Sequence, residues 1–387
     1  MCKSWDERRL GDFGECKIGL TYSPDNVVES KGTLVLRSSN IRDGRLAFED
    51  NVYVECRVPD GATVREGDIL VCVRNGSRAL IGKTAQIDSN AAGNAFGAFM
   101  AVFRSSINEY VFQLLNTEQF TRQVHRCLGA TINQITNADL RSFKFLFPPE
   151  NEQLKIVDIL RTWDNALEKL VALSSAKEKR LRALRSTLLL SELRSNGQRR
   201  NWSPTRLSTV THELTARNGK EELGRDYVMG VTKAQGVVPM REQTIARDIS
   251  RYKRLPTRAF AYNPMRINVG SIAMNEASET VLVSPDYVVF GCNPDGIEPD
   301  YLDHLRKTAW WAHYINSGGS GSVRQRTYYA DLAALRLPLP DIEEQREIVA
   351  ILNAAKADLS STEQMIKAVK LQKRGLMQKL LTGEWRV

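Results

Sequence analysis

Residues Glu152 to Leu160 read Glu-Gln-Leu-Lys-Ile-Val-Asp-Ile-Leu, and residues Glu344 to Leu352 read Glu-Gln-Arg-Glu-Ile-Val-Ala-Ile-Leu. The second stretch lies 192 positions after the first, and other residues on both sides of it match at the same offset. A shorter match joins Trp5 to Leu10 with Trp202 to Leu207. The chain therefore contains one module twice, and this repeat predicts two equivalent domains.

Each copy continues as a heptad pattern. Steps of four and three residues from Ile156 meet eight apolar residues in ten positions, and the same steps from Ile348 again meet eight in ten. The polar exceptions are Ser174, Lys177, Thr362 and Lys373. A 3.5-residue period held over four heptads predicts a coiled-coil seam rather than an ordinary surface helix, and each helix is expected to run roughly 50 Å. The predicted seam residues are Ile156, Leu160, Trp163, Leu167, Leu170, Leu181, Leu184, Leu188, Ile348, Leu352, Leu359, Ile366, Val369, Leu376 and Leu380.

Composition fits a soluble globular protein of two or three domains, with 387 residues, 42% hydrophobic and 26% charged. No apolar run approaches the roughly 18 residues of a membrane span, and the first residues lack the apolar core of a signal peptide. We therefore expect a cytoplasmic protein without a membrane segment. The six cysteines form no Cys-x-x-Cys pair, which argues against zinc and disulfide frameworks.

The net charge of +9 is uneven, with an excess of five positive charges in residues 151–200 and three in residues 201–340. This distribution is compatible with nucleic-acid binding. The run from Lys177 to Arg200 holds eight basic residues against two acidic ones. These residues can form a solvent-exposed helix face. Alternatively, they can bind the phosphates of the DNA spacer or an acidic surface of a partner.

Strand-like and helical stretches alternate in each half, which predicts a mixed α+β class. In the first half the strands are expected at Thr33–Leu36, Ile69–Val73, Phe99–Phe103 and Phe143–Phe147, with one helix from Asn108 to about Cys127. In the second half they are expected at Tyr227–Val231, Val281–Val283, Tyr287–Phe290 and Leu335–Pro340, with one helix from Tyr301 to Ile315.

Motifs for catalysis are absent from the sequence. There is no phosphate-binding loop, and the four histidines have no metal-ligand spacing. Asn263-Pro264-Met265 and Asn293-Pro294-Asp295 lack the second proline and the aromatic residue of the amino-methyltransferase motif, so both read as turns. The sequence predicts no catalytic and no metal site. An alternative is a catalytic protein, such as a methyltransferase, whose active site is formed by carboxylates that are distant in the sequence. This alternative predicts that the isolated chain binds S-adenosylmethionine.

The side chains suited to reading base edges lie on loops between the predicted strands. In the first half they are Arg37, Ser38, Asn40, Arg42, Arg74, Asn75, Arg78, Lys83, Asn133 and Gln134. In the second half they are Lys233, Gln235, Arg266, Asn268, Arg324, Gln325 and Arg326. The runs Arg74–Arg78 and Ser322–Arg326 are the strongest candidates, because neighbouring glycines allow close approach of the backbone.

The whole pattern resembles the specificity (S) subunit of type I restriction-modification systems. The resemblance rests on Trp5–Leu10, Ala138–Leu193, Ala330–Gly383 and the loop Gly318–Gln325, and with domain size and order it covers essentially the whole chain. One departure is the loop Gly129–Ile132, which is less glycine-rich than its counterpart, so the first loop can present its side chains differently.

The resemblance implies an α+β fold with two pseudo-twofold-related mixed α/β target-recognition domains, residues 1–150 and 196–340. Two long helices, residues 151–195 and 341–387, would separate them and form an antiparallel coiled coil. Each domain would read one half of a bipartite double-stranded DNA target, and the helices would set the spacer.

The same resemblance implies partners. The helices would dock two methyltransferase (M) subunits, and restriction (R) subunits would join that core. S-adenosylmethionine, ATP and Mg would belong to those partners, and this chain would be a non-catalytic subunit with no cofactor of its own. The main alternative is a non-enzymatic coiled-coil adaptor whose globular domains bind protein.

Overall fold

Residues 5–129, 133–190, 202–220, 222–317 and 326–387 are described by the structure, which is a computed structural model. The chain divides into two compact units. Unit 1 comprises Met1–Leu170 with Met365–Val387, and unit 2 comprises Val171–Gln364. Each unit therefore combines a globular part with one half of each long helix. The two units are defined by contacts between residues, whereas the predicted domains are continuous stretches of the sequence.

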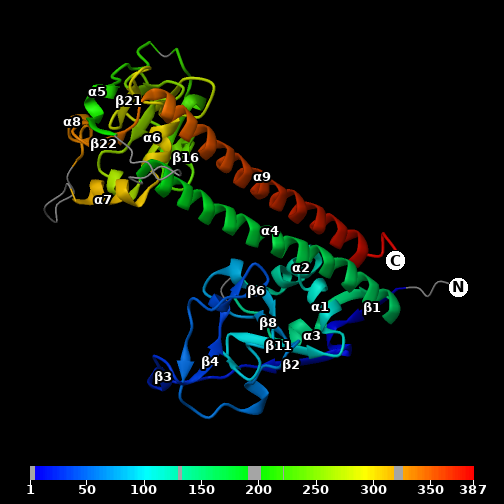
Figure 1. The fold of residues 1–387 in the computed structure, drawn as a ribbon. Helices are drawn as coiled ribbons and strands as arrows, with labels where there is room; N and C mark the ends of the chain where they lie inside the picture. Colours follow the sequence, from blue (N-terminus) through cyan, green and yellow to red (C-terminus); the bar gives the residue numbers. More distant parts are fainter. Residues whose placement is uncertain (1–4, 130–132, 191–201, 221, 318–325) are drawn as a thin grey trace. The chain divides into compact units, whose positions relative to one another are not determined.

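Unit 1 is built on two four-stranded sheets (Figure 1). The antiparallel sheet has the order β2 (Gly14–Ile18), β11 (Met100–Ser105), β8 (Ile69–Cys72), β9 (Thr84–Gln86). The second has the order β10 (Ala95–Phe96), β4 (Thr33–Leu36), β7 (Tyr53–Val54), β3 (Val27–Val28). Two strand pairs complete the unit: β1 (Asp6–Arg9) with β12 (Lys144–Phe147), and β5 (Ile41–Arg42) with β6 (Arg45–Leu46). All four residues of β8 are buried, which explains its unbroken apolar sequence.

Unit 2 repeats the antiparallel sheet of unit 1, and its second sheet again contains one parallel pair but in a different strand order. Its antiparallel sheet has the order β14 (Thr211–Glu213), β21 (Val288–Cys292), β18 (Phe260–Tyr262), β19 (Ile272–Met274). Its second sheet has the order β16 (Gly236–Pro239), β15 (Val228–Thr232), β20 (Val281–Val283), β17 (Lys253–Leu255). As β4 does with β10, β15 pairs in parallel with β20. Strand β13 (Ser203–Arg206) pairs with β22 (Arg336–Leu339), and short helices α5 (Leu207–Val210) and α8 (Tyr329–Ala333) flank this pair.

The prediction of a single helix in each half is wrong, because two shorter helices occupy each of these stretches. In unit 1 they are α1 (Asn108–Leu114) and α2 (Glu118–Cys127), followed by α3 (Asn137–Ser142); in unit 2 they are α6 (Pro299–Leu305) and α7 (Ala309–Ser317). A threonine stands at each break. Thr117 Oγ1 accepts from the Phe120 amide at 3.3 Å and donates to the Leu114 carbonyl at 2.7 Å. Thr308 Oγ1 does the same with Trp311 and Leu305, at 3.3 and 2.7 Å. Each hydroxyl caps the second helix and satisfies the end of the first.

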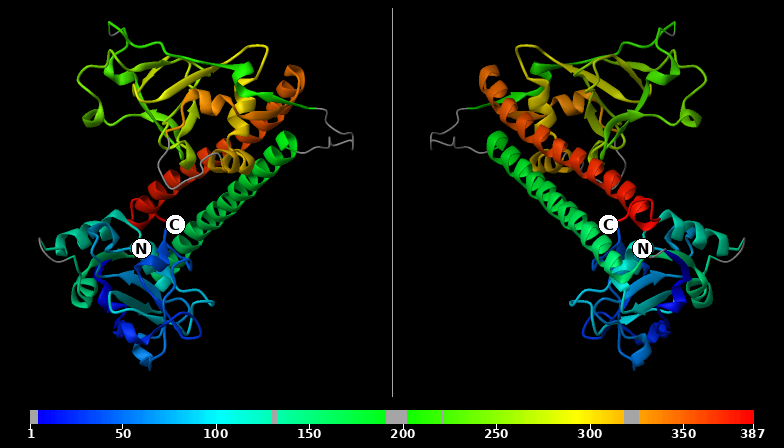
Figure 2. Two further views of the ribbon diagram at one scale, coloured as in Figure 1. Left: turned by 90° about the vertical axis from the view of Figure 1, so that its left-hand side faces the viewer. Right: turned by 90° about the vertical axis from the view of Figure 1, so that its right-hand side faces the viewer.

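The two long helices are α4 (Glu150–Leu190) and α9 (Ile342–Leu381), and their halves lie side by side in each unit (Figure 2). In unit 1, Glu152 bonds to Arg386 and Asp164 bonds to Lys373. Residue numbers therefore increase along the first segment in the direction in which they decrease along the second. The packing is therefore antiparallel. The expected α+β fold with two antiparallel long helices is confirmed.

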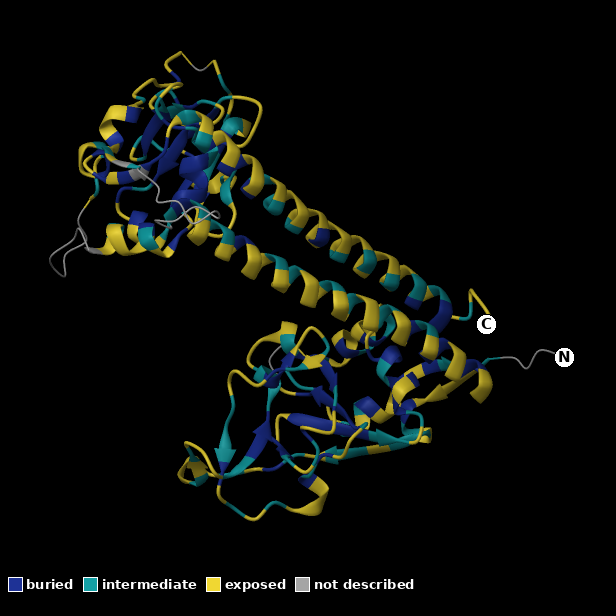
Figure 3. Cartoon of the chain, viewed as in Figure 1, coloured by how far each residue is buried: buried dark blue, intermediate teal, exposed yellow. Residues whose placement is uncertain are grey.

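Every predicted seam residue is buried or half-buried, while the outer faces of both helices are largely exposed (Figure 3). Three of the four polar exceptions, Lys177, Thr362 and Lys373, make contacts across the seam. Lys177 Nζ lies 2.7 Å from Asp358 Oδ1 and 2.9 Å from Thr362 Oγ1 in unit 2. Lys373 Nζ lies 2.5 Å from Asp164 Oδ1 in unit 1. The polar residues thus satisfy one another and do not interrupt the packing.

The repeated Glu-Gln pair fastens the start of each long helix. Trp5 Nε1 donates to Glu152 Oε2 at 3.2 Å, and Trp202 Nε1 donates to Glu344 Oε2 at 3.0 Å. In the same way Gln153 and Gln345 donate to the carbonyls of Pro148 and Pro340, both at 2.9 Å. The two tryptophans thus link the residue before the first strand of each unit to the start of a long helix. None of the helices in the described ranges combines the length and the apolar character that a membrane crossing needs.

Candidate nucleic-acid interface

Three segments of unit 1 that are distant in sequence meet where strands β4 and β8 end. They are residues 37–40 after β4, residues 73–78 after β8, and residues 133–135 before α3; with Phe99 we call them the first loop cluster. The Ile135 amide donates to the Val73 carbonyl at 2.9 Å, and Arg74 and Gln134 form an isolated antiparallel bridge. Of the predicted base-reading residues in these segments, five make contacts between one segment and another: Ser38, Arg74, Asn75, Asn133 and Gln134.

Asparagine side chains hold the turn that carries Arg74. Asn75 Nδ2 donates to Ser38 Oγ at 2.9 Å, and Asn75 Oδ1 accepts from the Ser77 amide at 2.9 Å. Asn133 Nδ2 donates to the Gly76 carbonyl at 3.0 Å. Both amides are committed within the cluster, so their main effect is to fix the loop's shape before any ligand binds.

Arg74 itself is exposed, and its guanidinium carbon lies over the ring of Phe99, 4.8 Å from the ring centroid. The Phe99 carbonyl accepts from the amides of Val73 and Arg74 at 3.1 and 3.0 Å. No carboxylate of the described residues forms an ion pair with Arg74. Phe99 is 55% exposed, and the sequence predicted it as the first residue of a strand. It was missed as a site residue, and its position directly after Gly97-Ala98 was the available signal for a turn.

The other predicted residues of unit 1 have different surroundings. Asn40 is fully buried, and its Nδ2 donates to the Ala47 carbonyl at 2.9 Å and to Asn51 Oδ1 at 3.1 Å. Asn40 was predicted to read bases, but its buried side chain instead stabilises the turn after β4. Arg37 pairs with Asp50 at 3.2 Å, as Arg42 pairs with Glu49 at 3.3 Å. Arg78 and Lys83 are exposed on the outer part of the loop after β8.

Unit 2 builds an equivalent arrangement, which we call the second loop cluster: residues 232–236 after β15, residues 263–271 after β18, and residues 326–327. The Thr327 amide donates to the Pro264 carbonyl at 3.0 Å, which repeats the bond between Ile135 and Val73. A Cβ added at Gly270 would lie 3.1 Å from Lys233 Cγ, so the lysine stem crosses this glycine. Lys233, Gln235, Arg266, Asn268 and Arg326 are all exposed in or beside these segments. Arg324 and Gln325, with the loop Gly318–Gln325, lie outside the described residues.

Exposed apolar side chains also mark the second loop cluster, and sequence reasoning missed them. Met265 and Val269 are 42% and 56% exposed, and Tyr328, beside Arg326, is 57% exposed. Such groups suit contact with thymine methyl groups.

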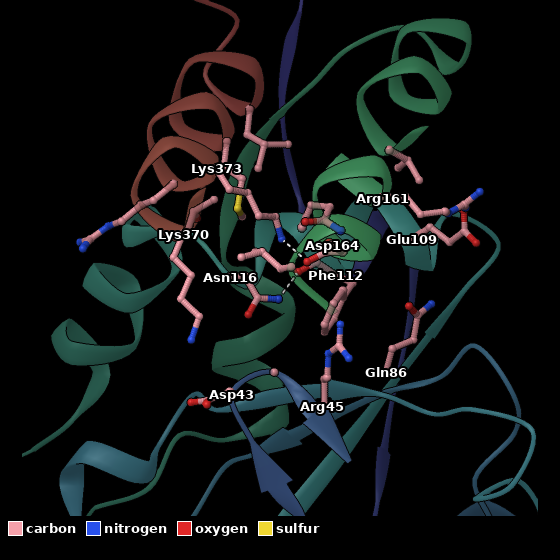
Figure 4. Close-up of a pocket in the computed structure, with 18 of the residues that line it drawn as sticks. Asp43, Arg45, Gln86, Glu109, Phe112, Asn116, Arg161, Asp164, Lys370 and Lys373 are labelled. Carbon is pink, nitrogen blue, oxygen red and sulfur yellow. Dashed lines mark hydrogen bonds and ion pairs between the residues drawn. The ribbon is translucent and has the colours of Figure 1, made fainter. Parts of the chain in front are cut away.

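A groove of unit 1 lies apart from the first loop cluster. It encloses about 1210 Å³ between the α4 and α9 segments, α1, α2 and the hairpin β5–β6 (Figure 4). Its charges are largely paired, with Lys373 bonded to Asp164, and Arg45 Nη1 3.2 Å from Glu168 Oε2. None of the predicted base-reading residues lines it.

Titratable groups give no sign of a reactive centre in the described part of the chain. No cluster of three or more His, Cys, Asp or Glu residues there could hold a metal ion. Burial raises the pKa of Cys72, beside the first loop cluster, to about 11, so its thiol stays protonated. Burial lowers the pKa of His304 to about 4, and the neutral ring accepts from Arg185 Nε at 3.2 Å and contacts Asn353 Oδ1 at 2.9 Å. Both groups are parts of the core.

Three comparisons with known proteins agree with this geometry. Residues 3–174 match the family model described as the type I restriction modification DNA specificity domain. The putative type I restriction enzyme MjaX specificity subunit of Methanocaldococcus jannaschii is 22% identical over 422 residues, covering 100% of this chain and 94% of that protein.

Solved structures share the fold. A chain from "Structural basis underlying complex assembly and conformational transition of the type I R-M system" has a TM-score of 0.58 at 16% identity, with 100% of both chains covered. The type I restriction-modification system S subunit from M. genitalium has a TM-score of 0.57 at 15% identity, with 97% of this chain and 96% of that chain covered. Residues 3–174 thus match the DNA specificity domain of type I restriction-modification systems, and the chain is similar along its whole length to a putative specificity subunit of such a system.

Proposed function

We propose that this chain is the DNA-reading, non-catalytic S subunit of a type I restriction-modification enzyme. The first loop cluster reads one half of a bipartite duplex target, and the second loop cluster reads the other half. The observation that carries the proposal is that the same three loops meet in both units, with different side chains on them.

The physical argument starts from what a base sequence offers to a protein. Base edges in the major groove present distinct donor and acceptor patterns, which Arg, Lys, Asn and Gln side chains can match. The first loop cluster presents Arg74 and Gln134, and the second presents Lys233, Arg266 and Arg326. Two similar frames with dissimilar readers suit a target made of two unrelated half-sites. Arg78 and Lys83 suit contacts to phosphates, which position a protein without specifying sequence.

The partners follow from this assignment. Two M subunits dock on the long helices and bring S-adenosylmethionine for methylation of adenine, and R subunits bring ATP-driven cleavage with Mg. The chain supplies recognition and spacing only. Because the two helices pack antiparallel, they suit a spacer that fixes the distance between the half-sites.

The test is selection of bound duplexes from a random library by the chain assembled with its M subunits. We expect one asymmetric, split motif, and methylome sequencing of the host should find the same motif methylated at adenine. Arg326→Ala should relax one half of that motif, whereas Arg122→Ala, on the exposed surface of α2, should leave both halves intact. Enrichment of no split motif would favour the protein-binding adaptor and reject the proposal.

A further inference from the structure

The first loop cluster presents Arg74 in a defined geometry. Its backbone amide is bonded to the Phe99 carbonyl, its backbone bridges to Gln134, and its guanidinium lies over the Phe99 ring. Of the other two arginines in the cluster, Arg37 pairs with Asp50, and Arg78 Nη2 donates to the Leu128 carbonyl at 3.5 Å. The structure therefore singles out Arg74 as the guanidinium that is fixed in place and not engaged by a described carboxylate.

The contact with Phe99 matters because of the shape of guanidinium. Its five N–H donors point outward in the plane of the group, so a ring beneath that plane attracts the cation without using the donors. A fixed planar fork matches the O6 and N7 acceptors of guanine, which lie side by side on the major-groove edge. Less rotamer freedom is then lost on binding, because the side chain is already ordered.

We propose that Arg74 reads a guanine in the half-site bound by unit 1, and that Phe99 is the positioning residue that fixes Arg74 for this contact. This inference rests on the proposed function and adds to it the base class and the residue that makes the contact specific. A phosphate contact is the competing role, and it would need neither a fixed guanidinium plane nor an aromatic ring beneath it.

Among the described residues of unit 2, no arginine–aromatic pair forms at the equivalent position. Phe99 stands directly before β11, and the residue directly before the equivalent strand β21 is Tyr287, which is half-buried and accepts from Lys253 Nζ through its carbonyl at 2.7 Å. The loop after β18 instead exposes Met265 and Val269. The arginine–aromatic reader is therefore expected to act on one half-site only.

The experiment uses the full chain assembled with its M subunits and the duplex that wild type selects. Each guanine of the half-site read by unit 1 is replaced in turn by 7-deazaguanine, which lacks the N7 acceptor. At one position we expect wild type to bind on the order of 10-fold more weakly. Arg74→Ala should be insensitive to that replacement, because the group that contacts N7 is gone.

The Phe99 variants separate positioning from a merely structural role. Phe99→Leu should lose most of the preference for guanine at that position while keeping affinity for unrelated DNA and the salt dependence of binding. Phe99→Trp should retain the preference, because tryptophan also attracts a cation to its face. Phe99 is more than half exposed, so unchanged thermal unfolding of Phe99→Leu is the control for folding.

Three results would overturn the inference. Arg74→Ala could weaken all sequences equally and lower the salt slope by about one, which would mean a phosphate contact. Arg74→Ala could remain sensitive to 7-deazaguanine at every position, or Phe99→Leu could keep full preference for guanine. In each case wild type would still select a split motif, so the proposed function would stand; selection of no split motif would instead reject the proposed function itself.

Discussion

Removing one heptad from each long helix tests whether the helices set the spacer of the DNA target. Residues 167–173 of α4 and 363–369 of α9 are the segments to delete. The double deletion keeps the seam in phase, because seven residues are one heptad, and it keeps the contacts of Lys177 with Asp358 and of Lys373 with Asp164. The ion pair lost with Glu168 joins it to Arg45, and both side chains are more than half exposed. Such a pair contributes about 0–1 kcal/mol, so the variant is expected to fold.

The magnitude follows from the rise of a helix. Seven residues at about 1.5 Å each shorten the helix pair by about 10 Å, which equals about three base pairs at about 3.4 Å. The preferred spacer should therefore shorten by about three base pairs. Those base pairs also turn the duplex by about 100°, whereas a heptad leaves the face of a coiled coil nearly unrotated. We expect the variant to bind its best site more weakly than wild type binds its own.

The assay is selection from duplexes that carry both half-sites with every spacer from zero to twelve base pairs, with the chain assembled with M subunits. Deletion of 167–173 alone is the matched control, because it mismatches the two helices and should lower stability without defining a new spacer. An unchanged preferred spacer in the double deletion would refute the idea that the helices measure the gap.

Two further predictions concern the polar contacts that hold each unit together. The free energy of unfolding should fall by up to roughly 3 kcal/mol as the pH drops from about 6.5 toward 4, because His304 is protonated in this range in the unfolded chain, whereas burial keeps its pKa at about 4 in the folded protein. In urea titrations at several pH values, His304→Gln should not show this decrease. The same decrease in the variant would mean that other groups cause it. Glu152→Gln should lower the free energy of unfolding at pH 7 by about 1–3 kcal/mol, because Arg386 donates to both carboxylate oxygens of Glu152 at 2.6 and 2.9 Å. These bonds lower the pKa of Glu152 in the folded protein, so the difference between variant and wild type should shrink as the pH falls through that pKa. A difference that does not change with pH would mean that the charge of Glu152 is not the cause.

The long helices and most strands could be predicted because their signals are local. The heptad phase placed every seam residue on the packed side, and the strands at Thr33–Leu36 and Val281–Val283 agree with β4 and β20 to the residue. The helix breaks at Thr117 and Thr308 were also local, since threonine is a common helix cap. They were missed because apolar spacing runs on through both breaks.

The loop clusters could be predicted only in part, because their contacts join residues that are distant in sequence. The bond from Asn133 to Gly76 spans 57 residues, and no periodicity reports it. Asn40 was assigned to base reading by residue type, whereas its burial depends on Ala47 and Asn51 packing around it. Phe99 looked like a strand residue because its neighbours are apolar, and its exposure depends on how the chain turns before β11.

The residues that the two halves share and those that they do not share perform different tasks. The shared tryptophan, glutamate and glutamine fasten the start of each long helix through the same hydrogen bonds in both units. The bond from Ile135 to Val73 and its counterpart from Thr327 to Pro264 join the same loops through backbone atoms alone, so they place no demand on the side chains. Side chains on these loops can therefore change without loss of the frame, as they must if one architecture is to read two different base sequences. The Arg74–Phe99 pair, which the equivalent described residues of unit 2 do not repeat, is the kind of difference that this division of tasks permits.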